Sequence, residues 1–147
     1  MKYDQLIEKM NKQLANWSVL FTKLHNYHWY VKGDQFFTLH DKFEELYGLA
    51  GTQIDELAER ILAIKGKPVA TMKEYLDISS VKEAEKNEGA FNMVANIEGD
   101  FERMVVEFDE IIDLAEKAHD EPTADMFISL KATLEKHAWM LRSFNGK

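Results

Sequence analysis

One histidine and three carboxylates share a face of a predicted helix and could bind a metal ion. At about 100° per residue, they fall near 0°, 40°, 60° and 100° on the helical wheel, in the order His40, Glu44, Asp55 and Glu59. The apolar residues of the same segment lie on a different face and recur at steps of three and four, which predicts an amphipathic helix: Phe36, Leu39, Phe43, Leu46, Ala50, Ile54, Leu57, Ile61 and Ile64. Imidazole and carboxylate donors without sulfur suit first-row divalent ions such as iron, zinc or manganese.

These four residues cannot reach one ion within a single chain. His40 and Asp55 are fifteen residues apart in the sequence, which is about 22 Å along a helix axis. A second copy of the helix, packed antiparallel about a two-fold axis, would bring His40 and Glu44 of one chain to Asp55 and Glu59 of the other. Two-fold contacts are the commonest contacts between identical chains. The spacing therefore favours two identical metal sites at a dimer interface.

Two glycines favour the same contact. Gly48 and Gly51 lie in the sector of the acidic residues, on either side of an axis near Leu49 and Ala50. Glycine inside a helix costs about 1 kcal/mol relative to alanine, so two on one face suggest a close approach of two backbones. A solvated charged face with two tolerated glycines is the alternative explanation.

A first helix must precede this one and supplies a second histidine. Apolar side chains at steps of three and four predict a helix from Tyr3 to His28, which should end near Gly33 and Asp34. His28 and His40 are each six residues from Asp34, so a helical hairpin would place the two histidines at similar heights. His28 thereby joins the predicted site.

The rest of the chain completes a four-helix pattern. The second helix should end around Lys65–Pro68, and a capping box predicts a short helix over Met72–Asp77 within a long crossover. Apolar stripes predict a third helix over Val94–Ala118 and a fourth from Pro122 to Phe144. The prediction is one all-α domain over 1–147, a ferritin-like four-helix bundle with one long crossover that carries a short extra helix.

Composition excludes several classes of function. The chain has 147 residues and no cysteine, which excludes thiolate metal sites, thiol catalysis and disulfides. Its net charge of −8 disfavours binding to nucleic acid and to anionic membranes and favours the attraction of cations. No signal region or membrane-spanning run is evident, so we expect a cytoplasmic protein.

Other candidate sites are weaker. Glu116 and His119 form a Glu-x-x-His pair, but intra-bundle di-iron sites need two such pairs, so we interpret this one as surface charge at a helix end. His137 lies on an apolar stripe and is interpreted as a core residue. No nucleophile elbow or glycine-rich phosphate loop supports a hydrolase or a nucleotide-binding protein.

Nearly the whole chain is similar to the Dps mini-ferritins. The similarity is carried by three runs, His28–Gly33, Phe36–His40 and Ile54–Arg60, and by the ending Lys136–Met140. The resemblance implies a dodecameric shell that oxidises Fe(II), in many members with hydrogen peroxide, and stores the ferric mineral inside. The alternative of a larger ferritin shell is disfavoured by the short chain.

The resemblance also implies roles for single residues. It gives a ferroxidase centre between two subunits, with His28 and His40 from one and Asp55 and Glu59 from the other as catalytic metal ligands. Glu44 matches a further acidic ligand position, and Trp29 matches an aromatic residue beside the centre. Acidic residues near the junction of the third and fourth helices are similar to those lining iron-entry pores: Glu116, Asp120, Glu121 and Asp125.

Two alternatives concern DNA and partners. Family members that bind DNA through a lysine-rich tail differ from this sequence, in which the helical pattern begins at Tyr3 and the chain stops just after Phe144. We therefore expect DNA binding to be weak or absent, and compaction of DNA is the second hypothesis. A third is a partner-binding helical scaffold, which predicts a monomer or simple dimer that ignores iron.

Overall fold

The computed structural model describes residues 3–147, which separate into two compact units. One unit spans Ile7–Ala90, and the other combines the chain up to Leu6 with Phe91–Lys147. Each is described by itself. The expectation of a single domain stays a prediction.

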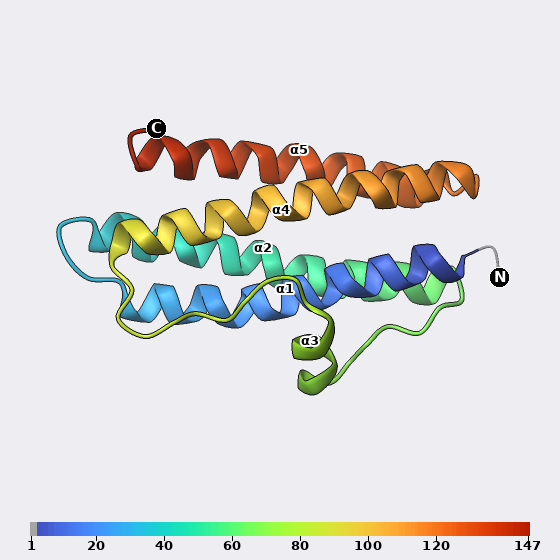
Figure 1. Ribbon diagram of the computed structural model, residues 1–147, viewed down its shortest axis with the longest axis horizontal. Helices are drawn as coiled ribbons and strands as arrows, with labels where there is room; N and C mark the ends of the chain where they lie inside the picture. The colour runs from blue at the N-terminus through green and yellow to red at the C-terminus, as the bar shows by residue number, and fades with distance from the viewer. Residues whose placement is uncertain (1–2) are drawn as a thin grey trace. The chain divides into compact units, whose positions relative to one another are not determined.

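The first unit is a helical hairpin followed by a long crossover (Figure 1). Helix α1 (Asp4–Tyr30) and helix α2 (Phe36–Ala63) run antiparallel, and the short helix α3 (Met72–Ile78) interrupts the crossover. The hairpin turns at Gly33, whose φ of 104° favours glycine, and the amide of Phe36 donates to the carbonyl of Gly33 (3.0 Å). This turn fixes the register of the two helices that carry His28 and His40.

The crossover follows α1 over most of its length. The amide of Val69 donates to Asn11 Oδ1 (2.9 Å), the amide of Ser80 donates to Asn16 Oδ1 (2.8 Å), and the Tyr27 hydroxyl donates to Glu88 (2.8 Å). The chain therefore travels from the start of α1 towards its end before α4 begins. The predicted capping box is confirmed, since Thr71 accepts from the amide of Glu74.

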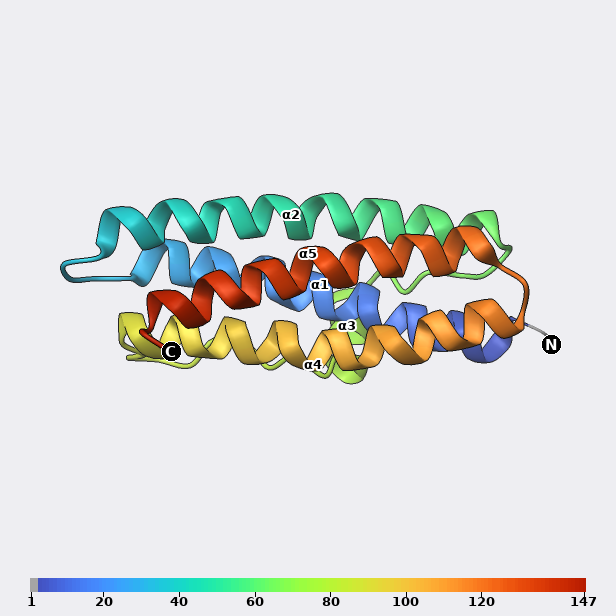
Figure 2. The ribbon, with the colours of Figure 1, turned by 90° about the horizontal axis from the view of Figure 1, so that it is seen from above.

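The second unit is another antiparallel hairpin, formed by α4 (Ala90–Lys117) and α5 (Glu121–Phe144) (Figure 2). Phe108 and Phe127 pack edge to face between the two helices, with ring centroids 5.2 Å apart. Asp120 caps α5 by accepting from the amide of Thr123 (3.2 Å) and from its hydroxyl (2.6 Å).

The five predicted helices are confirmed, and their ends differ from prediction by a few residues. One predicted core position is wrong: Phe21 is 36% exposed, although one edge of its ring packs against Tyr47 of α2. Ile54 is half-buried, and Gln53 beside it is buried. No helix within residues 3–147 combines the length and the apolar character that a membrane span requires.

Candidate metal centre

His28 and His40 meet at the turn end of the α1–α2 hairpin. Their rings stack with centroids 3.7 Å apart and planes inclined by 13°. His28 Nδ1 lies 2.7 Å from the backbone oxygen of His40, and His40 Nδ1 lies 2.8 Å from the backbone oxygen of His28. The expectation that a hairpin brings the two residues to one height therefore agrees with the structure.

These reciprocal hydrogen bonds fix the tautomer of both imidazoles. A carbonyl oxygen only accepts, so each Nδ1 must carry the proton. In the neutral ring the lone pair then belongs to Nε2, the atom available to a metal ion. A hydrogen bond from the other ring nitrogen to a carbonyl is the usual support of a metal-binding histidine. Both rings are thus oriented before any ion arrives.

Glu44 adds a carboxylate to this pair. Its Oε1 lies 4.0 Å from His28 Nε2, and each of the three residues offers a ligand atom within 4.8 Å of the others. His28 is only 7% exposed, whereas the Glu44 side chain is 59% exposed. The cluster therefore has an inner wall of two imidazoles and an outer carboxylate that solvent reaches. Two imidazoles and one carboxylate are a donor set suited to Fe(II).

Asp55 and Glu59 lie outside this cluster. Both are exposed residues of α2, about four turns further along the helix than His40 and Glu44. Within one chain, the structure brings together three of the five predicted ligands and leaves these two apart. Their joining the site through a second copy of α2 stays a prediction.

An aromatic group surrounds the histidines, and sequence reasoning missed most of it. Tyr47 stands edge-on to His28 at 5.3 Å and stacks on His25 at 3.7 Å, while Phe36 stacks on His40 at 4.9 Å. Trp29 lies 5.3 Å from His25 and is 66% exposed. The spacing held a signal for Tyr47, because residues three apart on a helix are neighbours and Glu44 is three before it.

The two glycines of α2 have different surroundings. A Cβ added at Gly48 would meet no atom within 4 Å, whereas one at Gly51 would lie 3.2 Å from the ring of Phe21. Gly51 therefore has an explanation within the chain, and only Gly48 keeps open space before it. Of these two glycines, Gly48 alone leaves room for the close approach of a second helix.

The other candidates lie elsewhere. Glu116 and His119 are exposed at the end of α4, where His119 has a φ of 59°. Asp120 is buried as the cap of α5, whereas Glu121 and Asp125 are exposed. A role for these acids in an iron pore stays a prediction. His137 is half-buried beside Phe101, with ring centroids 6.4 Å apart, as a core histidine would be.

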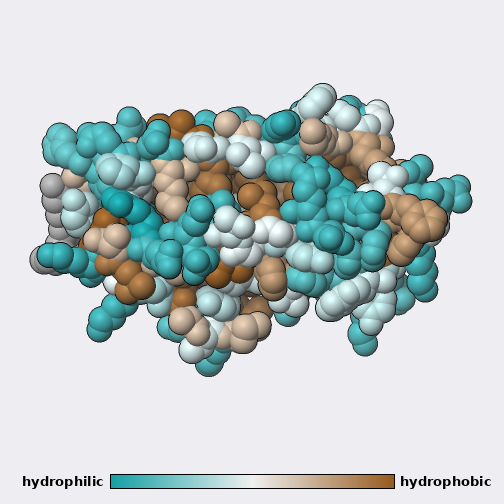
Figure 3. All heavy atoms as spheres, turned by 180° about the vertical axis from the view of Figure 1, so that it is seen from behind, coloured by the Kyte–Doolittle hydropathy of each residue, from teal (hydrophilic) through white to brown (hydrophobic). Residues whose placement is uncertain are grey.

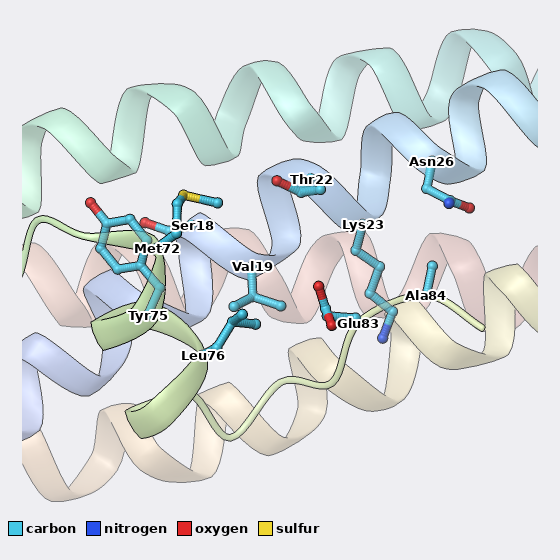
Figure 4. Close-up of a pocket in the computed structure, with 10 residues that line it drawn as sticks. All are labelled: Ser18, Val19, Thr22, Lys23, Asn26, Met72, Tyr75, Leu76, Glu83 and Ala84. Atoms are coloured by element: carbon cyan, nitrogen blue, oxygen red, sulfur yellow. The ribbon is translucent and has the colours of Figure 1, made fainter.

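A pocket of about 190 Å³ is separate from the metal centre. It lies between α1, α3 and the crossover, and its walls mix apolar side chains with Lys23 and Glu83 (Figure 4). None of the predicted site residues lines it.

Comparison with known proteins identifies the family of this chain. The family model described as a Ferritin-like domain matches residues 7–147. The chain is 62% identical over 140 residues to DNA protection during starvation protein 2 of Bacillus anthracis, covering 95% of this chain and 96% of the relative. It also resembles the crystal structures of Dps from Staphylococcus aureus (48% identity, TM-score 0.95) and Bacillus brevis (49% identity, TM-score 0.96), with 97% of this chain and 96% of either structure covered.

Helical hairpins, a long crossover and a carboxylate–histidine site define the chain as ferritin-like. The similarity to Dps proteins extends over almost all of its length. The chain belongs to the Dps mini-ferritins, and the predicted family and fold class are confirmed.

Proposed function

We propose that this protein stores and detoxifies iron. It would oxidise Fe(II), with hydrogen peroxide as the oxidant, and keep the ferric mineral inside a dodecameric shell. The observation that carries the proposal is the histidine pair, whose reciprocal hydrogen bonds use both Nδ1 atoms and leave both Nε2 atoms available to a metal ion beside Glu44. Membership of the Dps mini-ferritins supports iron as the metal.

The complete site would form between two protomers. His28, His40 and Glu44 of one chain would bind Fe(II) with Asp55 and Glu59 of its partner, whose spacing along α2 suits an antiparallel pair of helices. Two neutral imidazoles supply lone pairs, and the carboxylates balance the charge of the ion in a partly dry interface.

The site's task is to hold Fe(II) where peroxide can accept its electrons. Two Fe(II) ions give up one electron each, and one peroxide takes both electrons and two protons to become two water molecules. Because peroxide is reduced completely, less hydroxyl radical escapes. The ferric ions would then leave for acidic residues on the inner wall of the shell. Glu116, Asp120, Glu121 and Asp125 are our candidates for the entry path of Fe(II).

Exposed aromatic side chains support assembly. Hydrophobic side chains reach the surface at several places among hydrophilic ones (Figure 3). At the end of the α1–α2 hairpin, Phe37 is 81% exposed, and Trp29 and Tyr30 are also exposed. Such groups usually mark a contact with another molecule. The net charge of −8 disfavours direct binding to DNA. We therefore propose that the protein protects the cell from oxidative damage by its iron chemistry and not by covering DNA.

The test is iron uptake by the intact protein. Protein loaded anaerobically with Fe(II) and treated with peroxide should elute as a particle near twelve subunits, with ferric absorbance in the same peak. Asp55→Asn with Glu59→Gln should slow uptake sharply. Glu56→Gln with Asp113→Asn, which removes the same types of exposed acid elsewhere, should not. A small, iron-free parent protein would refute the proposal and favour the scaffold hypothesis.

A further inference from the structure

A single protomer already holds a three-donor cluster with oriented ligand atoms. His28, His40 and Glu44 belong to one chain, and their donor atoms lie within 4.8 Å of one another. The carbonyls that accept from both Nδ1 atoms belong to the same hairpin, so no partner is needed to orient the rings. One chain therefore presents three of the five proposed ligands before it meets a second chain.

We propose that a divalent ion in this cluster also ties the two protomers together, so that metal occupancy strengthens the two-fold contact. The inference rests on the proposed site between two protomers. It adds a structural role to the metal, separate from its oxidation.

The charges of α2 give the reason. In the proposed contact, the partner's two acids would approach Glu44, so each metal-free site would gather three carboxylates. The basic residues of α2, Lys42 and Arg60, lie about 200° round the helix from His40 and so point away from this face. Lys42 contacts Glu45 at 3.5 Å. No basic residue of the helix therefore offsets the repulsion, whereas a divalent ion would.

The effect on assembly follows from linkage. Suppose that an ion binds five donors of two chains more tightly than three donors of one chain. Its binding then raises the association constant of the two chains by the ratio of the two metal affinities. Each two-fold contact contains two such sites, so the ratio enters twice. An affinity gain of only about threefold per site would strengthen the contact about tenfold.

The experiment follows exchange of subunits between assemblies. Full-length protein with natural isotopes is mixed with ¹⁵N-labelled protein, and native mass spectrometry follows the mixed species with time. The metal-free protein is compared with protein loaded with Co(II), which binds imidazole and carboxylate donors and, without an added oxidant, keeps its oxidation state. We expect Co(II) to slow exchange at least tenfold.

Variants separate this inference from the proposed function. Asp55→Asn with Glu59→Gln keeps the side-chain shapes and removes the repulsion, so its metal-free assemblies should exchange more slowly than the parent's and respond little to Co(II). Its visible Co(II) spectrum should still report binding to the three-donor cluster. The control, Glu56→Gln with Asp113→Asn, should respond to Co(II) like the parent.

The possible results are distinct. Equal exchange with and without Co(II) in the parent would overturn the metal tie and leave the ferroxidase proposal intact. Slower exchange with Co(II), but no uptake of iron with peroxide, would support the tie and refute the ferroxidase proposal. A double variant that still responds to Co(II) as strongly as the parent would also overturn the inference, because the ion would then act without the partner's acids.

Discussion

Replacement of Gly48 by alanine separates the stability of the chain from the stability of its proposed two-fold contact. The added Cβ meets no atom within 4 Å inside the protomer. In a helix interior this exchange should stabilise the folded chain by about 1 kcal/mol. For a chain of this size that is roughly 2–4 °C in melting temperature.

The same methyl group should weaken the contact between protomers. An axis near Leu49 and Ala50 would place Gly48 of one helix opposite Gly51 of the other, so each contact would receive two added methyl groups. Overpacking costs about 1–3 kcal/mol per site, or about 2–6 kcal/mol for the pair. Even the lower value weakens association roughly thirtyfold.

Two assays on the Gly48→Ala variant measure these two effects. Subunit exchange should become faster, while urea unfolding should show a more stable chain once the protomers have dissociated. Gly99→Ala is the control, because its Cβ also meets open space but lies on α4. It should stabilise the chain and leave exchange unchanged. If Gly48→Ala exchanges no faster than this control, Gly48 does not face a partner and the proposed axis is wrong.

Three further variants test the fold by urea unfolding. Asn16→Ala should destabilise the chain by about 2–4 kcal/mol, because the half-buried amide of Ser80 and the buried amide of Val81 lose their acceptor; a loss below about 1 kcal/mol would show that the crossover is held mainly by other contacts. Asp120→Ala should cost about 1–2 kcal/mol through loss of the α5 cap, and an unchanged midpoint would contradict that role. Burial, and then the negative charge of Glu102, raise the pKa of Glu98 above its ordinary value of 4.5. Ionised Glu98 therefore destabilises the fold above that raised pKa, and Glu98→Gln should be more stable by under about 1 kcal/mol at pH 8 and equal to the parent below about pH 4. An equal gain at both pH values would mean that charge is not the cause.

The histidine pair could be predicted because it depends on counting. Each histidine lies six residues from Asp34, and any tight hairpin turned there brings them level. Helix periodicity likewise gives the length of α2 and the sector that holds Glu44, Asp55 and Glu59. These features follow from local geometry, which the sequence specifies without knowledge of what packs beside it.

The crossover contacts could not be predicted in this way. Asn16 is fully buried although it lies off the apolar stripe of α1, because the crossover covers a second face of that helix. Gln13 and Lys23 are buried as well. Periodicity identifies an apolar face, but it carries no information about which polar face a segment sixty residues later will cover.

The proposed division of the site between two chains agrees with where hydrogen-bond partners for its histidines are available. Each imidazole needs a fixed carbonyl, and the hairpin end provides one for each ring because two helices meet there. The same register that supplies these carbonyls leaves Asp55 about 22 Å along α2 from His40, and Glu59 the same distance from Glu44. A shift of α2 by one residue would turn His40 by about 100° and break both hydrogen bonds. In the proposed site, the hairpin that orients the histidines thus leaves the two remaining α2 carboxylates to be supplied by a second chain.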